Sequence, residues 1–233
     1  MLKRSAVVCL SIWMVCPILA GQNADKLKDE RERAANAAEV LNEIMKTPDQ
    51  SIPQELLSRS YGMAIIPHVV KGALGVGGRH GKGLIATRRA SGKWGTPAFV
   101  DLSGGSFGFQ IGVTATDLIL VFTDRSGIDG LLSGKLKFGV DAAAAAGPVG
   151  RTAEASTDVK LKSAIYSYSR SKGLFAGVAL DGAVLSIDDS ANHKVYGIGV
   201  SGTNILVDNK VNPNPVVNPF VTALTKHAAK RTK

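Results

Sequence analysis

A serine inside a glycine cluster is the first candidate for chemistry. Gly104, Ser106 and Gly108 match the G-x-S-x-G pattern in which many hydrolases carry a nucleophilic serine. That nucleophile lies on a sharp turn between a strand and a helix, which exposes its hydroxyl group. Here the following residues, FQIGVTATDLILVF, alternate like a strand and not like a helix. We therefore expect Ser106 to lie in a β-turn or bulge, and a serine hydrolase is the weakest alternative.

Two other patterns lack the partners that their chemistry needs. Ser169 and Lys172 have S-x-x-K spacing, but neither an S-D-N nor a K-T-G element accompanies them. The glycine run at residues 72–83 is not a phosphate-binding P-loop, because Val76 and Gly83 stand where that loop needs glycine and Ser or Thr. Its successive backbone N–H groups can still form an anion-binding nest beside neighbouring cations.

Metal ligands are sparse. The four histidines are far apart, and none stands in an H-x-x-x-H spacing. A polar cluster between Asp188 and His193 could hold a metal ion, but Asp or Asn before a short helix is more typical of a helix cap. We therefore expect no catalytic residue, no metal site and no cofactor.

Positive charge is the strongest chemical signal. The chain has a net charge of +9, and residues 56–100 contain seven Lys and Arg residues and no acidic residue. Such a stretch suits an anionic surface such as phospholipid head groups, although an ordinary solvated surface is the alternative. Nucleic acid is not an expected partner, since few aromatic residues interleave with the cations for base stacking. Head-group contact is expected at five residues: Lys71, Arg79, Lys82, Arg88 and Arg89.

The first 20 residues have the features of a secretory signal peptide. Two basic residues precede an apolar run at residues 6–20, and small residues follow it. An uncleaved anchor helix is one alternative; a lipoprotein is less favoured, because Cys9 and Cys16 each follow valine. Cleavage would remove both cysteines and predicts a periplasmic or secreted protein without a disulfide, able to associate peripherally with a membrane.

The elements that must position these residues predict an α+β fold, mostly antiparallel β, with many short glycine-rich strands and a helix at each end. Apolar residues at three- and four-residue spacing predict an amphipathic helix at residues 25–46, which packs on its own domain or lies in a lipid interface. Short apolar runs split by Gly, Ser and Pro predict five or six strands between residues 63 and 123. The expected organisation is a signal peptide (1–20), an N-terminal helix (21–47), a β-rich core (48–208), and a Pro-rich linker with a basic C-terminal helix (209–233).

Turn and cap signals subdivide the core further. Residues 51–54 match a capping box for a short helix, and residues 127–132 suit one helical turn. A single strand is expected across residues 136–147. Three more strands follow between residues 163 and 188, separated by turns at 172–173 and 181–182, where Asp-Gly is a hairpin signal. Short helices are expected near residues 190–195 and 219–230.

Six motifs resemble the SYLF-domain family and stand in its order. They are GMAIIP (62–67), GKWGTP (92–97), GFQIG (108–112), AGPVGRTA (146–153), YSYSRSKGLFAGVALDG (166–182) and YG (196–197). The resemblance covers roughly residues 26–208. The family is described as a lipid-binding module, with phosphoinositide-membrane binding in eukaryotic members, and some yeast relatives also bind actin and carry an SH3 domain.

The resemblance implies a non-catalytic protein that binds anionic phospholipid at a bacterial cell envelope. A periplasmic structural or scaffold protein that binds another protein is the alternative. Two departures matter: the segment that corresponds to the family's N-terminal amphipathic helix is acidic at its start, and a secreted chain would not normally meet phosphoinositides. No part of the sequence resembles an SH3 extension, so those partners are not implied. The sequence leaves the oligomeric state open.

Overall fold

The computed structural model describes residues 26–149, 163–171, 174–178 and 180–228. The expected signal peptide, the turn at 172–173 and the end of the expected C-terminal helix lie outside these residues. The elements in chain order are α2 (Lys28–Lys46), α3 (Gln54–Arg59), β1 (Gly62–Thr87), β2 (Ala98–Phe122), α4 (Ser126–Leu132), β3 (Lys135–Lys137), β4 (Ala144–Ala146), β5 (Ile165–Ser171), β6 (Leu174–Gly177), β7 (Ala183–Ile187), α6 (Asp189–Tyr196), α7 (Gly202–Leu206), η1 (Pro215–Val217) and α8 (Asn218–His227). The expected α+β class, with a helix at each end, is confirmed.

Two strands of 26 and 25 residues, β1 and β2, dominate the sheet. They pair antiparallel over nearly their whole length, and the register shifts at two places, after Ile66 and after Ala73. The expectation of five or six short strands between residues 63 and 123 is therefore wrong. Glycine and serine between the apolar runs do not end the strands; glycine weakens a strand but allows it to bend, and bulges absorb the irregular spacing.

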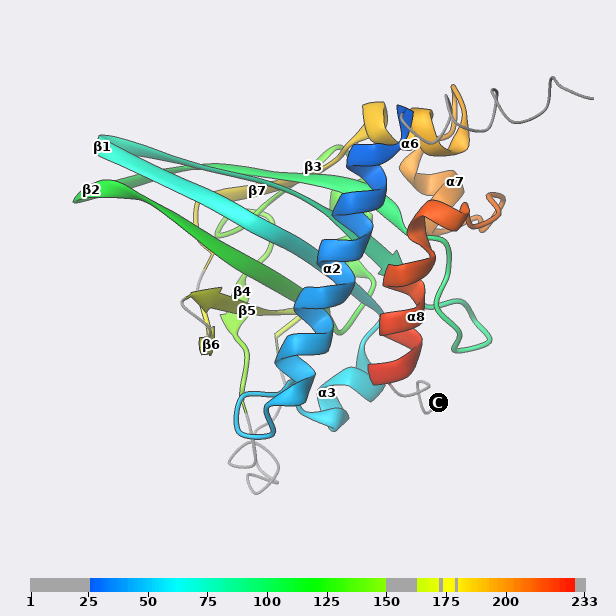
Figure 1. Cartoon of the computed structure of the whole chain (residues 1–233), viewed down its shortest axis with the longest axis horizontal. Helices are drawn as coiled ribbons and strands as arrows, with labels where there is room; N and C mark the ends of the chain where they lie inside the picture. The colour runs from blue at the N-terminus through cyan, green and yellow to red at the C-terminus, as the bar shows by residue number, and fades with distance from the viewer. Residues whose placement is uncertain (1–25, 150–162, 172–173, 179, 229–233) are drawn as a thin grey trace, which may run out of the picture.

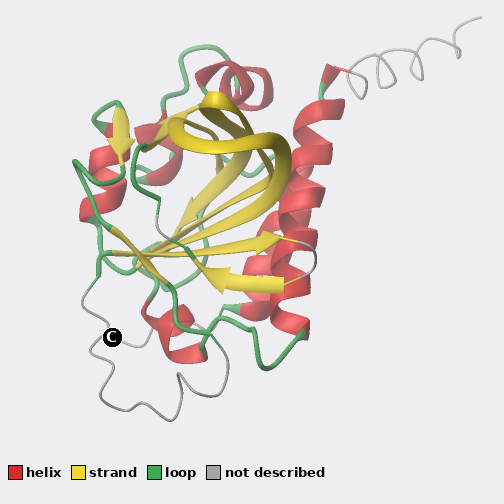
Figure 2. Cartoon of the chain, turned by 90° about the vertical axis from the view of Figure 1, so that its left-hand side faces the viewer, coloured by secondary structure: helices red, strands yellow, loops and turns green. Residues whose placement is uncertain are grey.

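The β1–β2 ribbon doubles back on itself (Figures 1 and 2). The first half of β1 pairs with the second half of β2, and the second half of β1 pairs with the first half of β2. Where the two halves of β1 cross, a Cβ atom on Gly83 would overlap the carbonyl oxygen of Ile65 and lie 2.8 Å from the Cα atom of Ile66. A side chain at position 83 would therefore push the two backbones apart, and only glycine permits the contact.

The other strands complete a seven-stranded sheet among the described residues. Its order is β3-β7-β2-β5-β4, with β1 beside β2 and β6 beside β5, and every pair is antiparallel except β4 with β5. The turn at Asp181 and Gly182 does not close a hairpin, contrary to expectation, because β6 pairs with β5 whereas β7 pairs with β2 and β3. Instead the N–H group of Gly182 donates to the carbonyl of Phe138 at 3.0 Å.

Helices cover the sheet and bury two apolar cores. Leu41 of α2, Leu56 of α3 and Phe220 of α8 are fully buried in one core, together with one face of the β1–β2 ribbon. Ile128 of α4 and Ile205 of α7 belong to the second core, on the opposite face. Figure 1 shows α2 and α8 side by side across the sheet. The apolar face of α2 is therefore docked on its own domain, one of the two arrangements that the sequence leaves open.

Three local expectations need correction. The capping box at residues 51–54 is wrong, because α3 begins after Pro53 and the Ser51 hydroxyl donates to the carbonyl of Pro48 at 3.0 Å. The single strand at residues 136–147 is also wrong, since a turn with Gly139 at φ +88° separates β3 from β4. Helix α7 is absent from the sequence-based expectations; Ser201 caps it in a box that uses asparagine at the third position in place of Glu or Gln.

Replacing Gly83 by alanine is expected to lower the free energy of unfolding by about 2–3 kcal/mol, because backbone atoms cannot rotate away from the new methyl group. Gly105→Ala is the matched control in the same ribbon, since a Cβ atom there meets nothing within 4 Å. Its effect should stay within about 0.5 kcal/mol. Urea unfolding of the two variants measures the difference, and equal stability would show that the halves of β1 do not touch at Gly83.

Candidate functional site

The five predicted head-group contacts do not form one patch. Arg88 is only 7% exposed, and its guanidinium lies 4.2 Å from the ring centre of Trp94. The same group donates to three backbone carbonyls, those of Leu57, Ser60 and Gly92. These contacts hold the segment after β1 in place, so Arg88 has a structural role and is not available at the surface. Arg89 follows it and is half-buried.

The other three predicted residues lie on β1. Lys71 and Lys82 are exposed, and Arg79 is half-buried. Side chains of a strand alternate between its two faces, so Arg79 and Lys82, three residues apart, point to opposite faces of the ribbon. Lys82 lies on the face that α2 covers, and Arg79 lies on the other. The basic segment thus presents cations on both faces of a ribbon and not on one surface.

Carboxylates distant in sequence lie close to this basic segment. Arg33 of α2 donates to Asp188 at 2.9 Å, and both side chains are nearly buried. Lys82 lies 4.0 Å from the same carboxylate, and Asp101 is its cross-strand neighbour. We call Arg33, Lys82, Asp101 and Asp188 the α2 charge cluster. It joins α2 to the sheet and to α6, and it partly neutralises Lys82.

The two acids of the α2 charge cluster have opposite pKa shifts. Burial, together with the nearby charge of Asp188, raises the pKa of Asp101 above its ordinary value. Burial opposes ionisation of Asp188 too, but the N–H group of Ala191 and the guanidinium of Arg33 lower its pKa overall. Asp188 therefore ionises at a lower pH than Asp101 does. The sequence predicts a helix cap in the polar cluster at residues 188–193, and in the structure the cap is Asp188, which accepts the Ala191 N–H bond at the start of α6.

A second charge cluster stabilises the bend in the ribbon. Arg170 of β5 forms ion pairs with Glu43 of α2 and, at 2.6 Å, with Asp117 of β2. Asp117 also accepts a 2.9 Å bond from the backbone N–H of His68, whose φ of +50° lies in the left-handed region. His68 stands at the first register shift of β1. The carboxylate thus holds the bulge at which the ribbon begins to turn.

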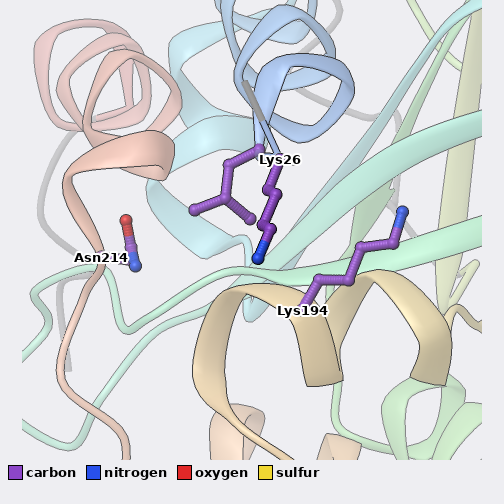
Figure 3. A pocket seen from close by; sticks show the side chains of 4 residues that line it. Lys26, Lys194 and Asn214 are labelled. Atoms are coloured by element: carbon purple, nitrogen blue, oxygen red, sulfur yellow. The ribbon is translucent and has the colours of Figure 1, made fainter. Parts of the chain in front are cut away.

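Two open hollows border α2. One, of about 420 Å³, has a lining of mixed charge between α2 and β1 that includes Asp29, Arg33 and Lys82. The other, of about 650 Å³, is lined by Lys26, Leu27, Lys194 and Asn214 among the described residues (Figure 3). Lys194 is an ion-pair partner of the buried Glu30, at 3.1 Å. Within the described part of the chain, no group of three His, Cys, Asp or Glu side chains is placed to hold a metal ion.

Ser106 lies inside β2 and pairs with Gly77 across the ribbon, with strand on both sides of it. The expectation of a turn or bulge at this residue is therefore wrong. The strand–turn–helix arrangement of a nucleophile elbow is also not found at this position.

The middle of the ribbon projects beyond the rest of the fold (Figure 1). Strand β2 pairs with β7 up to Gly104 and with β5 from Asp117, so between these residues its described partner is β1 alone. A Cβ atom on Gly72 would meet nothing within 4 Å, and Val113 is 78% exposed. We call residues 69–78 of β1 with residues 105–116 of β2 the ribbon tip. The sequence carries a signal for the ribbon tip in its high density of glycine. The prediction of short strands interprets these glycines as turns between strands.

Among the described helices, none is long and apolar enough to cross a bilayer.

Comparison with known proteins agrees with this fold and its motifs. The family model Ysc84, described as "Las17-binding protein actin regulator", matches residues 103–227. LAS seventeen-binding protein 3 of Saccharomyces cerevisiae is 32% identical over 207 residues, which cover 87% of this chain and 45% of that protein. SH3 domain-containing YSC84-like protein 1 of Homo sapiens is 31% identical over 190 residues, which cover 80% of this chain and 55% of that protein.

The chain therefore belongs to the Ysc84 family, which is the SYLF-domain family that its motifs indicate. It spans about half the length of the curated relatives it matches.

Asp188→Asn is expected to lower the free energy of unfolding at pH 7 by about 2–3 kcal/mol, because Arg33 would stay buried without its counter-charge. Asparagine can still cap α6, so the cap is kept. The exposed neighbour Asp189 offers the matched control, Asp189→Asn, for which a change within about 0.5 kcal/mol is expected. Urea unfolding of the native chain and of both variants measures these differences in the free energy of unfolding.

The same variant has a pH signature. Since folding lowers the pKa of Asp188, its stabilisation is present above the unfolded value near 4 and is lost as the pH falls through the folded value. Asp188→Asn should therefore lose less stability than the native chain between about pH 5 and pH 2. If the free energy of unfolding of the variant fell as steeply between about pH 5 and pH 2 as that of the native chain, Asp188 would not be a source of this pH dependence.

Proposed function

We propose that this chain is a non-catalytic lipid-binding protein that binds anionic phospholipid head groups through basic side chains of its β-rich core. The supporting observation is the run of seven cations without an acid at residues 56–100, of which four are exposed: Arg59, Lys71, Lys82 and Lys93. Family membership adds to this, because lipid binding is what the SYLF resemblance implies. Lys71 is the head-group contact that we propose first, and Lys82, on the opposite face of β1 and partly neutralised by Asp188, is the second.

Electrostatic attraction alone makes this binding weak and reversible. A Lys or Arg side chain close to an anionic surface contributes about 1 kcal/mol, so two lysines contribute about 2 kcal/mol. An apolar element must add to this if the protein is to stay on a membrane. Helix α2 does not supply that element in its docked position, because Ala37, Leu41 and Ile44 on its apolar face are buried.

We further propose that binding takes place at the surface of a bacterial cell envelope, with the protein periplasmic or secreted. The basic and apolar pattern of residues 1–20 supports this location. Association would then be peripheral, and the lipid would be an anionic phospholipid of that membrane.

Protein binding is the second candidate function. The names of yeast relatives refer to binding of Las17, and the description of the family model adds actin regulation. Those relatives are about twice as long as the region they share with this chain, so the regions that they do not share are equal candidates for such partners. A stable complex with another envelope protein, formed without any lipid preference, would favour this function.

Co-sedimentation with vesicles tests the lipid proposal. The full chain, and a second preparation without residues 1–20, should bind vesicles with phosphatidylglycerol at low salt and dissociate at high salt. Neutralising both lysines, Lys71→Gln with Lys82→Gln, should weaken binding about 10- to 30-fold. The matched control neutralises two exposed lysines of β3, Lys135→Gln with Lys137→Gln, and should bind like the native chain.

Failure of both preparations to bind anionic vesicles would overturn the lipid proposal and favour the protein partner. If both double variants bound vesicles equally weakly, the net charge of the protein would determine binding, and the two β1 lysines would not be specific head-group contacts.

A further inference from the structure

We infer that the ribbon tip is the element that enters the lipid interface, with Val113 reaching the boundary of the acyl chains and Lys71, on the opposite face of the ribbon, at the level of the head groups. This inference rests on the proposed lipid binding and assigns the part of the molecule that carries it.

Exposure is the first argument. Val113 is 78% exposed and Val70 is 46% exposed, although a folded chain usually buries such side chains. Both lie on one face of the ribbon, because Val70 pairs with Ala115 and Val113 pairs with Gly72, two residues further along β1. Val70 borders the mixed-charge hollow beside α2, whereas Val113 does not line that hollow, so Val113 is the apolar side chain that the inference uses. An isolated two-stranded ribbon is marginally stable in water. A surface that covers this apolar face would therefore stabilise the tip as well as bind it.

Charge is the second argument. Lys71 is the only charged residue in the sequence of the ribbon tip; the rest consists of glycine, apolar residues, Ser, Thr and one Gln. Charged groups make entry into a membrane costly, and here a single cation has to remain among the head groups. The flanking Arg79 also suits an anionic surface, and the flanking Asp117 is already neutralised by Arg170. The tip thus combines low desolvation cost with attraction to negative charge.

The backbone limits the depth and argues against another strand as the occupant. The described edges of the tip leave N–H and C=O groups without sheet partners, so the tip belongs in the hydrated interface and not in the hydrocarbon core. Edge pairing with a second chain is disfavoured, because lysine on an edge and frequent glycine both weaken strand addition. A lipid surface can cover such a ribbon without any alignment of backbone hydrogen bonds, whereas an added protein strand would need a defined register. A lipid surface is therefore the better match.

Quenching by lipids with brominated acyl chains tests this directly on the full chain. Val113→Trp should show strong additional quenching in anionic vesicles beyond the signal from native Trp13 and Trp94. Val140→Trp is the matched control, since Val140 is 80% exposed on the turn after β3. Its added tryptophan should remain unquenched.

Binding of aspartate variants to the same vesicles gives a second measurement. Val113→Asp should weaken binding about tenfold or more, whereas Val140→Asp should bind like the native chain. Circular dichroism checks that both are folded. If the native chain binds but the two positions behave alike, the tip is not the inserted element and lipid binding stands. If the native chain binds no vesicles, the proposed function itself fails. A native oligomer that Val113→Asp dissociates without lipid would overturn the inference in favour of a contact between copies.

Discussion

The close crossing of the two halves of β1 is the constraint on which the rest of the structure depends. Gly83 lies against the backbone of Ile65 and Ile66, at a distance that no side chain permits. This contact lets a ribbon of two 25- and 26-residue strands double back on itself. One of its faces then covers the core beneath α2 and α8, the other covers the core beneath α4 and α7, and its middle is left to project.

Ionic contacts complete the docking of α2 on this ribbon. Arg33 pairs with Asp188 near one end of the helix, and Glu43 pairs with Arg170 near the other. Arg170 in turn joins the carboxylate that holds the bulge at His68. Helix position and ribbon shape are therefore linked through the same side chains. The docking also buries the apolar face that a membrane-inserting helix would need. In this position α2 cannot insert into a membrane, and the ribbon is the better candidate for that role.

Membership of the Ysc84 family joins the chain to a yeast protein whose name refers to binding of another protein, and the family model is described as an actin regulator. The proposed lipid binding has a physical basis in the structure, because exposed lysines and a glycine-rich tip whose single charged residue is Lys71 occur on one ribbon. Neither feature requires catalysis. The lipid binding proposed for this chain does not conflict with partner binding by the longer relatives, because more than half of LAS seventeen-binding protein 3 lies outside the shared region.

Local patterns in the sequence were sufficient for the α+β class, the terminal helices, a helix cap in the polar cluster at residues 188–193, and the family. These depend on neighbours within a few residues, through apolar spacing, capping and short motifs. Only the tertiary structure decided that the glycine segments are two continuous strands and that Asp181 and Gly182 close no hairpin. It also decided that Arg88 is buried, that Lys82 faces Asp188, and that the basic segment has two faces. Such outcomes depend on residues that folding brings together from distant parts of the chain. A count of charges along the sequence does not show which carboxylates lie beside the basic segment in space.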